Sequence, residues 1–191
     1  REPLTMGHHT FDADRAASLE TAERRYRALS AEELRWAVDC SPEDVVADLG
    51  SGTGFYTDDI APHVGSVYAV DLQPEMHEFY REKGCPDNVD LLTAPVDDMP
   101  LGTDSVDTAF STMTYHEFAT ADAIEEIKRV LRASGRLVVA DWAGDGEGEQ
   151  GPPLAERYTL AEAVATLREH DVTIQFEAAR PETFLLVATT E

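Results

Sequence analysis

Short apolar runs alternate with helical patterns through the middle of the chain, and this alternation restricts the possible fold more than any other feature. The apolar runs lie at residues 45–49, 66–71, 89–92, 106–111 and 135–142. The helical patterns between them lie at about residues 55–62, 74–83 and 121–131. Strands that are apolar on both faces are typical of parallel sheets covered by helices on both sides. The sequence therefore predicts a doubly wound α/β fold.

The two ends of the chain depart from this alternation. Residues 11–39 carry apolar side chains at three- and four-residue steps, which predicts helix, and a capping box at residues 30–33 starts a second helix there. Another capping box, at residues 159–162, opens a later helix. Two apolar runs follow, at residues 172–178 and 183–189, with a Pro-Glu turn between them. They predict an antiparallel hairpin.

The balance of charge is strongly acidic. The chain carries 38 Asp and Glu against 15 Lys and Arg, a formal net charge of −23. Nucleic-acid binding depends on basic side chains that neutralise phosphates, so this charge argues against a nucleic-acid partner, and likewise against an anionic membrane surface. The acids are dispersed along the chain, and the lysines are only Lys83 and Lys128. Because such self-repulsion destabilises a compact chain at low ionic strength, we expect a halophilic protein.

The sequence also favours the reducing cytoplasm. No apolar run approaches the roughly 18–20 residues that a membrane-spanning helix needs, and residues 1–10 lack the apolar core of a signal peptide. Cys40 and Cys85 are isolated, which predicts neither a disulfide framework nor a zinc site. A length of 191 residues without a long linker predicts one domain, residues 1–191.

A glycine-rich turn follows the first apolar run and gives the strongest chemical signal. The stretch from Asp48 reads Asp-Leu-Gly-Ser-Gly-Thr-Gly, and Asp71 ends the next run, 21 residues after Gly50. Glycines let the backbone approach a ligand closely, and an acid at this distance suits a pair of ribose hydroxyls. A dinucleotide fingerprint would have glycine where Phe55 stands, and Asp48 would repel a pyrophosphate. A ligand with a ribose at one end and an amino-acid ammonium group at the other fits better, as in S-adenosylmethionine.

Residues 46–55 resemble motif I of the class I S-adenosylmethionine-dependent methyltransferases. The similarity extends from about residue 31 to the end and includes residues 70–71, 97–101 and 131–137. In style the chain is similar to the small-molecule branch, which includes the ubiquinone and menaquinone C-methyltransferases. The resemblance implies a Rossmann-like sheet of seven strands in the order 3-2-1-4-5-7-6, with strand 7 antiparallel. It also implies that N-terminal helices, residues 1–40, cover a pocket on a core of residues 41–191.

The resemblance assigns a set of residues to S-adenosylmethionine and its product S-adenosylhomocysteine. Asp48 and the glycine backbone would hold the methionine part, Asp71 the ribose, and Leu72 would pack on adenine. Many relatives have an acid where Pro95 stands, so the contact at the adenine edge passes to its neighbours. The implied cofactor residues are Asp48, Gly50, Ser51, Gly52, Gly54, Asp71, Leu72, Val96, Asp97 and Ser111.

His116 is the candidate catalytic base, because it follows the fourth apolar run and relatives often carry a histidine nearby. The alternative is a structural histidine bonded to the backbone. Candidate substrate residues are His9, Tyr115 and Arg157; the alternative for Arg157 is an ion pair with a surface acid. Adjacent histidines such as His8 and His9 rarely bind one ion, so no metal is expected.

These observations together predict methyl transfer to a small-molecule acceptor. The accepting atom stays open at this point. One alternative is a non-catalytic protein that binds S-adenosylmethionine. A second is a nicotinamide-dependent oxidoreductase, against which Phe55 and the lack of a Tyr-x-x-x-Lys pair both count.

The acidic surface generates a prediction on stability. We expect the urea midpoint of unfolding to rise between low-salt buffer and molar KCl, because the salt screens repulsion among a large excess of carboxylates. An equal midpoint in both buffers would contradict the halophilic interpretation.

Overall fold

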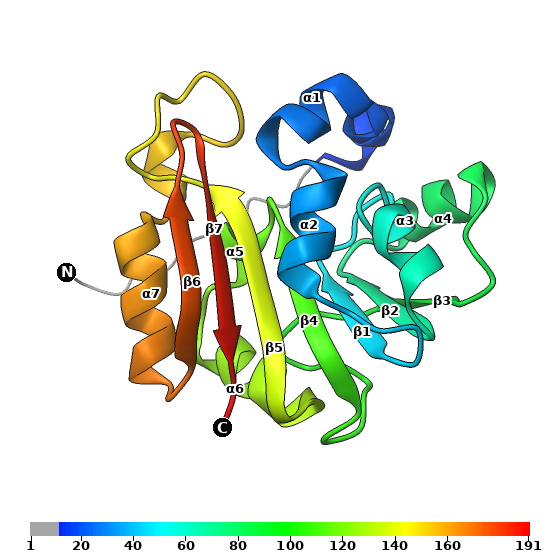
Figure 1. Ribbon diagram of the computed structural model, residues 1–191. Coiled ribbons are helices and arrows are strands. Elements are labelled where there is room, and N and C mark those ends of the chain that lie inside the picture. The colour runs from blue at the N-terminus through cyan, green and yellow to red at the C-terminus, as the bar shows by residue number, and fades with distance from the viewer. Residues whose placement is uncertain (1–11) are drawn as a thin grey trace.

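The computed structural model describes residues 12–191, and seven strands form one sheet across this part of the chain (Figure 1). Their order is β3-β2-β1-β4-β5-β7-β6, and β7 runs antiparallel to both of its neighbours while the other pairs are parallel. The strands are β1 (Val45–Leu49), β2 (Ser66–Asp71), β3 (Val89–Thr93), β4 (Val106–Thr112), β5 (Leu131–Trp142), β6 (Thr173–Ala179) and β7 (Thr183–Thr189). The predicted strand order and the C-terminal hairpin are confirmed.

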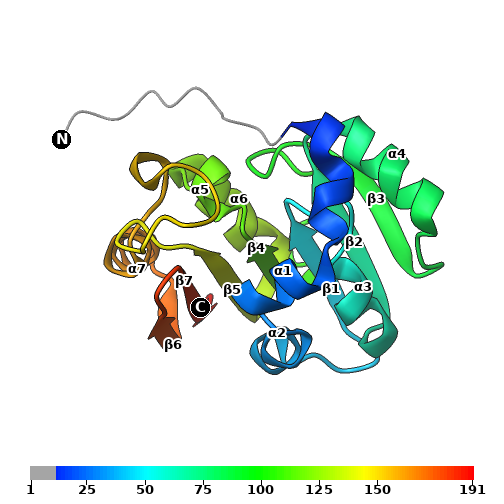
Figure 2. The same ribbon diagram turned by 90° about the horizontal axis from the view of Figure 1, so that it is seen from above.

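Helices cover both faces of the sheet (Figures 1 and 2). They are α1 (Ala22–Ala28), α2 (Ala31–Val38), α3 (Thr57–Ile60), α4 (Pro74–Lys83), α5 (Tyr115–Phe118), α6 (Ala121–Val130) and α7 (Leu160–Glu169), with 3-10 turns η1 (Ala13–Glu20), η2 (Ala61–His63) and η3 (Leu154–Glu156). None of these helices is long and apolar enough to cross a membrane.

The core has two layers because side chains alternate along each strand. In β5, Leu137 and Val139 pack with α6 and α7, whereas Val138 and Ala140 pack with α2 and α3. The same division holds in β1, where Ala47 faces the first layer and the preceding valine faces the second. A strand that is buried on both faces reads as a continuous apolar run, which is why these strands were visible in the sequence.

Helix starts follow the predicted signals closely. Both capping boxes form, with Ser30 paired to Glu33 and Thr159 paired to Glu162. Pro74 occupies the first turn of α4, where its missing N–H costs nothing. These signals mark the starts of α2, α4 and α7.

The structure corrects two expected boundaries. The helical region predicted over residues 11–39 is divided into η1, α1 and α2, with Thr21 and Leu29 in extended conformation between them. The break after η1 has a tertiary cause, because Glu20 accepts hydrogen bonds from Thr53, beside the glycine turn, and from Lys83, at the end of α4. β5 begins at Leu131 rather than at residue 135, since Leu131 already pairs with Val106 before a register shift.

The turn after β1 requires glycine because its backbone adopts positive φ and because it packs closely on neighbouring residues. Gly50 N–H and Ser51 N–H both donate to Val70 O, at 2.8 and 2.9 Å, so the turn stays close to β2. Gly54 has a φ of +77°, and a Cβ there would lie 2.1 Å from Cε1 of Tyr80. The turn is therefore fixed by positive φ and by close packing on α4.

We expect Gly54→Ala to lower the free energy of unfolding by about 1–3 kcal/mol more than Gly148→Ala does. Gly148 is a matched control because its φ is also +77°, while its Cβ would meet only the flexible Leu154 side chain at 3.2 Å. Equal losses for the two variants in urea melts would show that the Tyr80 contact does not matter.

Candidate functional site

A pocket of about 830 Å³ lies at the carboxyl ends of the parallel strands. Residues from the turns after β1, β2, β3 and β4 line it, together with Trp142 at the end of β5. Residues of η1 and α1 line it from the other side. Doubly wound sheets bind their ligands at this edge, so the fold and the pocket agree on the location of a site.

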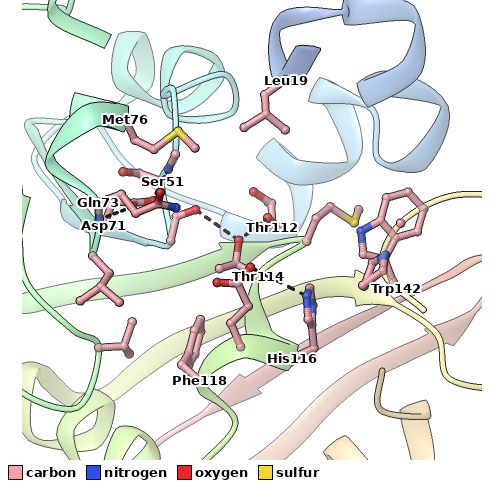
Figure 3. A pocket seen from close by; sticks show the side chains of 18 of the residues that line it. Leu19, Ser51, Asp71, Gln73, Met76, Thr112, Thr114, His116, Phe118 and Trp142 are labelled. Carbon is pink, nitrogen blue, oxygen red and sulfur yellow. Dashed lines mark hydrogen bonds and ion pairs between the residues drawn. The ribbon is translucent and has the colours of Figure 1, made fainter. Parts of the chain in front are cut away.

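Asp71 ties the glycine turn to β2. Its Oδ2 accepts from Gly52 N at 2.7 Å and its Oδ1 accepts from Gln73 N at 2.9 Å. Burial raises the pKa of Asp71, although these hydrogen bonds oppose that shift. Figure 3 shows Asp71, Ser51 and Gln73 together on one side of the pocket. Each carboxylate oxygen keeps a lone pair with which it can accept from a ligand hydroxyl.

Asp48 lies beneath the same turn and is 1% exposed. Its Oδ2 accepts from Thr57 Oγ1 at 2.6 Å, while its Oδ1 has no partner within residues 12–191. Burial raises the pKa of Asp48 to about 7, and the charge of Asp71 adds to this effect. An incompletely bonded buried carboxylate favours a cationic donor as its missing partner.

Arg25 of α1 lines the pocket and was missed by the sequence analysis. Its Nε is buried without a hydrogen-bond partner, and within the described chain its guanidinium forms no ion pair. The guanidinium carbon lies 4.6 Å from the ring centroid of Tyr56. Burial lowers the pKa of Arg25, with the charges of Tyr56 and Asp48 opposing that shift. An adjacent Arg24-Arg25 pair in so acidic a chain was the signal that could have identified it.

The turn after β3 also lines the side of the pocket where Asp71 lies. Val96 is buried and Asp97 is exposed, and both line the pocket with Pro95. Leu72, which is 52% exposed, lines it as well. The structure thus brings together the residues expected at an adenine ring.

His116 stands at the other side of the pocket, on the short helix α5 (Figure 3). Its Nδ1 lies 3.1 and 3.0 Å from the two carboxylate oxygens of Asp141, and its backbone N–H donates to Asp141 Oδ2 at 2.7 Å. Burial would lower the pKa of His116, but the charge and hydrogen bond of Asp141 outweigh it and raise the pKa. The ring therefore bonds a carboxylate rather than a backbone carbonyl.

Asp141 is a second residue that sequence reasoning missed. It is 1% exposed near the end of β5 and also accepts from Trp142 N at 2.7 Å. The signal was a single acid inside the apolar run 137–142. Buried carboxylates need donors on every side, and Asp141 has three.

Several expected site residues lie outside the pocket lining, and buried Asp48 is one of them. Tyr115 is in the core against Phe118 and Tyr158, Ser111 is fully buried in β4, and Gly54 packs on Tyr80. The Arg157 guanidinium is buried and bonds Glu182 and the carbonyl oxygens of Gln150 and Pro152, so it holds a loop. His9 falls outside the described residues.

Comparisons with known proteins agree with this geometry. The model of a methyltransferase domain family matches residues 47–139. An uncharacterized methyltransferase of Mycobacterium tuberculosis is 33% identical over 180 residues, covering 88% of this chain and 73% of that protein. The crystal structure of an S-adenosylmethionine-dependent methyltransferase from Aquifex aeolicus has a TM-score of 0.87 and 27% identity, covering 95% of this chain and all of that one. An arsenite methyltransferase of Halobacterium salinarum is 29% identical over 69% of this chain and 35% of its own length.

The His116–Asp141 pair generates a prediction on proton affinity. We expect His116 to titrate above its ordinary pKa of 6.5 in an NMR pH titration, and at a clearly lower pKa in Asp141→Asn, where only the weaker charges of Glu117 and Glu156 still oppose burial. The pair then stabilises the fold most at pH values below 6.5, and this contribution is lost as pH rises through the raised pKa.

His170 serves as the internal control, because its partner Glu125 is on the surface and far from the change in sequence. A His116 pKa that is unchanged in Asp141→Asn would contradict the assigned cause.

Proposed function

The chain belongs to the class I S-adenosylmethionine-dependent methyltransferases, and from this membership we propose that it transfers a methyl group from S-adenosylmethionine to a small-molecule acceptor. The family assignment rests on the relative from Mycobacterium tuberculosis, which is 33% identical and aligns with 88% of this chain. The site supports the finer statements that follow, residue by residue.

One observation carries the assignment of the cofactor end of the pocket. Asp48 and Arg25 are buried groups of opposite charge near one glycine turn, and each has a polar atom without a partner in the described chain. They form no ion pair with each other. The methionine part of S-adenosylmethionine offers an ammonium group and a carboxylate, so one ligand satisfies both residues.

The remaining contacts extend this binding mode along the pocket. Asp71 accepts from the two ribose hydroxyls while its backbone donors keep it in place. Leu72, Val96 and Asp97 then border the adenine. Ser111 and Gly54 do not line the pocket, and they support the turn and the strand ends from behind. Asp48 lies under the same turn with its Oδ1 unbonded in the described residues, and the proposed ammonium contact is to that oxygen.

The protein contributes orientation and electrostatics to the reaction. S-adenosylmethionine supplies an electrophilic methyl group on a sulfonium. Alignment of two reactants in one pocket supplies roughly 7–11 kcal/mol of the barrier. His116, with Nδ1 bound to Asp141, leaves Nε2 to take a proton from the acceptor. Leu19 and Arg25 of the N-terminal segment line the pocket, which supports a role of this segment as its cover.

Three further features of the setting belong to this proposal. A net charge of −23 supports a small-molecule acceptor rather than a nucleic acid, and supports a protein adapted to high salt. Cys40 and Cys85 are free, which supports a reducing compartment such as the cytoplasm. The similarity in style to ubiquinone and menaquinone C-methyltransferases supports the small-molecule branch.

Calorimetric titration with S-adenosylmethionine and S-adenosylhomocysteine in molar KCl tests the cofactor. We expect micromolar binding of both, and Asp71→Ala to weaken it by at least about one to two decades, because even one lost hydrogen bond to a charged group is worth roughly 1.5–3 kcal/mol. We expect Arg25→Met to weaken S-adenosylhomocysteine, but not 5′-methylthioadenosine, which lacks the amino-acid part.

Asp90→Ala is the matched control, since it removes one exposed carboxylate from β3 outside the pocket. NADH should not bind. Absence of S-adenosylhomocysteine binding in folded protein would contradict the proposal at its root, and binding without turnover of any acceptor would favour a non-catalytic role.

A further inference from the structure

We propose that the acceptor is an aromatic hydroxyl compound, methylated on oxygen after His116 has removed its proton. This inference rests on the proposed function and concerns the half of the pocket that the cofactor residues do not occupy. Figure 3 shows that half around His116, Phe118 and Trp142, across the pocket from Ser51 and Asp71.

The first step of the argument is the orientation of the histidine ring. Asp141 accepts from the backbone N–H of His116 and lies within hydrogen-bond distance of Nδ1, so the ring is held at two points. A buried carboxylate next to Nδ1 favours the tautomer with the proton on that nitrogen. Nε2 is then an acceptor, and Glu117 Oε1 lies 3.9 Å from it, beyond hydrogen-bond distance. This geometry is that of a general base.

The second step is the charge around that base. Asp141 on β5, Glu117 on α5 and Glu156 on η3 all act on His116, and all three are acids. Glu117 and Glu156 also line the pocket. A negative surrounding opposes the entry of an acceptor that is already an anion, such as a carboxylate or a phenolate. The acceptor must therefore enter with its proton and lose it inside the pocket.

The third step is the shape of the wall beside His116. The Trp142 ring is fixed, because a Cβ at Gly151 would lie only 2.5 Å from its Cδ2 and the Arg157 guanidinium carbon lies 5.6 Å from the ring. Phe118, Pro152 and Met113 complete an apolar wall. Met113 lies in the left-handed region, with a φ of +59°, which residues other than glycine rarely adopt. Rigid aromatic and proline surfaces suit a flat apolar ligand.

The fourth step is the strength of base that the acceptor requires. A phenol has a pKa near 10, so a histidine can assist its ionisation during attack, whereas an aliphatic alcohol is far too weak an acid. A thiol, with a pKa near 8.5, ionises more readily and depends less on a base. In the proposed step the acceptor oxygen bonds the methyl carbon, its proton passes to His116 Nε2, and the carbon–sulfur bond breaks with its electron pair left on sulfur.

A set of acceptors on one scaffold tests the proposal. Methyl transfer from labelled S-adenosylmethionine is measured in molar KCl with 1-naphthol, 1-naphthylamine, naphthalene-1-thiol, 1-naphthoic acid and the saturated decahydro-1-naphthol. Phenol, catechol and hydroquinone widen the hydroxyl set. We expect transfer to aromatic hydroxyls above all others. Since the chain has two tryptophans, Trp36→Phe leaves Trp142 as the single reporter, and 1-naphthol should quench its fluorescence.

Variants separate the base from its positioning residue. We expect His116→Gln to lower turnover of 1-naphthol by 10²-fold or more, with unchanged affinity for S-adenosylhomocysteine. Asp141 is a positioning residue, so Asp141→Asn should also shift the acidic limb of the pH–rate profile to lower pH. The loss in His116→Gln should be smaller for the thiol. His170→Gln, which alters a histidine–carboxylate pair on the surface, should change nothing.

Three outcomes would overturn the proposal. They are faster transfer to the amine, thiol or carboxylate than to any hydroxyl, full turnover of 1-naphthol in His116→Gln, and no transfer to any aromatic hydroxyl by protein that binds S-adenosylhomocysteine. If the unaltered protein does not bind S-adenosylhomocysteine, the result instead contradicts the proposed function.

Discussion

The hydrogen bond from Gly52 N–H to the Asp71 carboxylate is the contact on which the pocket depends. It joins the turn after β1 to the end of β2, and the backbone donors Gly50 and Ser51 reinforce it through Val70 O. A parallel sheet brings strand ends together at one edge, but it does not fix how the turns beyond them lie. The hydrogen bond from Gly52 to Asp71 holds the turn in place, so that edge has a defined shape for a ligand.

Most of the fold could be predicted from the sequence, because local sequence patterns mark its strands and helices. Strands buried on both faces appear as continuous apolar runs, and the capping residues Ser30 and Thr159 mark helix starts within a few residues. The boundaries that failed have tertiary causes. The break after η1 depends on Glu20 reaching Thr53 and Lys83, which no local pattern contains.

The site was less predictable for the same reason. The glycine turn and Asp71 form a pattern at fixed spacing, so their place at one edge of the pocket could be predicted from the sequence. Arg25 and Asp141 could not, because each acts through a partner distant in sequence. For Arg157 the prediction failed in the other direction. A charged side chain near a proline pair suggested a ligand contact, whereas its guanidinium donates to a carbonyl oxygen of its own loop.

Charge is arranged differently on the surface and in the pocket. Most basic side chains have carboxylate partners, as Lys83 does with Glu20 and Asp58. In contrast, Asp48 and Arg25 are buried, and each has a side-chain atom without a hydrogen-bond partner in the described residues. Burial raises the pKa of Asp48 and lowers the pKa of Arg25, so it favours the neutral form of each. Burying a charged group without a full set of hydrogen-bond partners costs stability. Under the proposed function, a zwitterionic ligand would remove that cost at both groups, and its binding would stabilise the fold by mass action. Because Arg25 belongs to α1 and Asp48 to β1, such binding would also couple the N-terminal segment to the sheet.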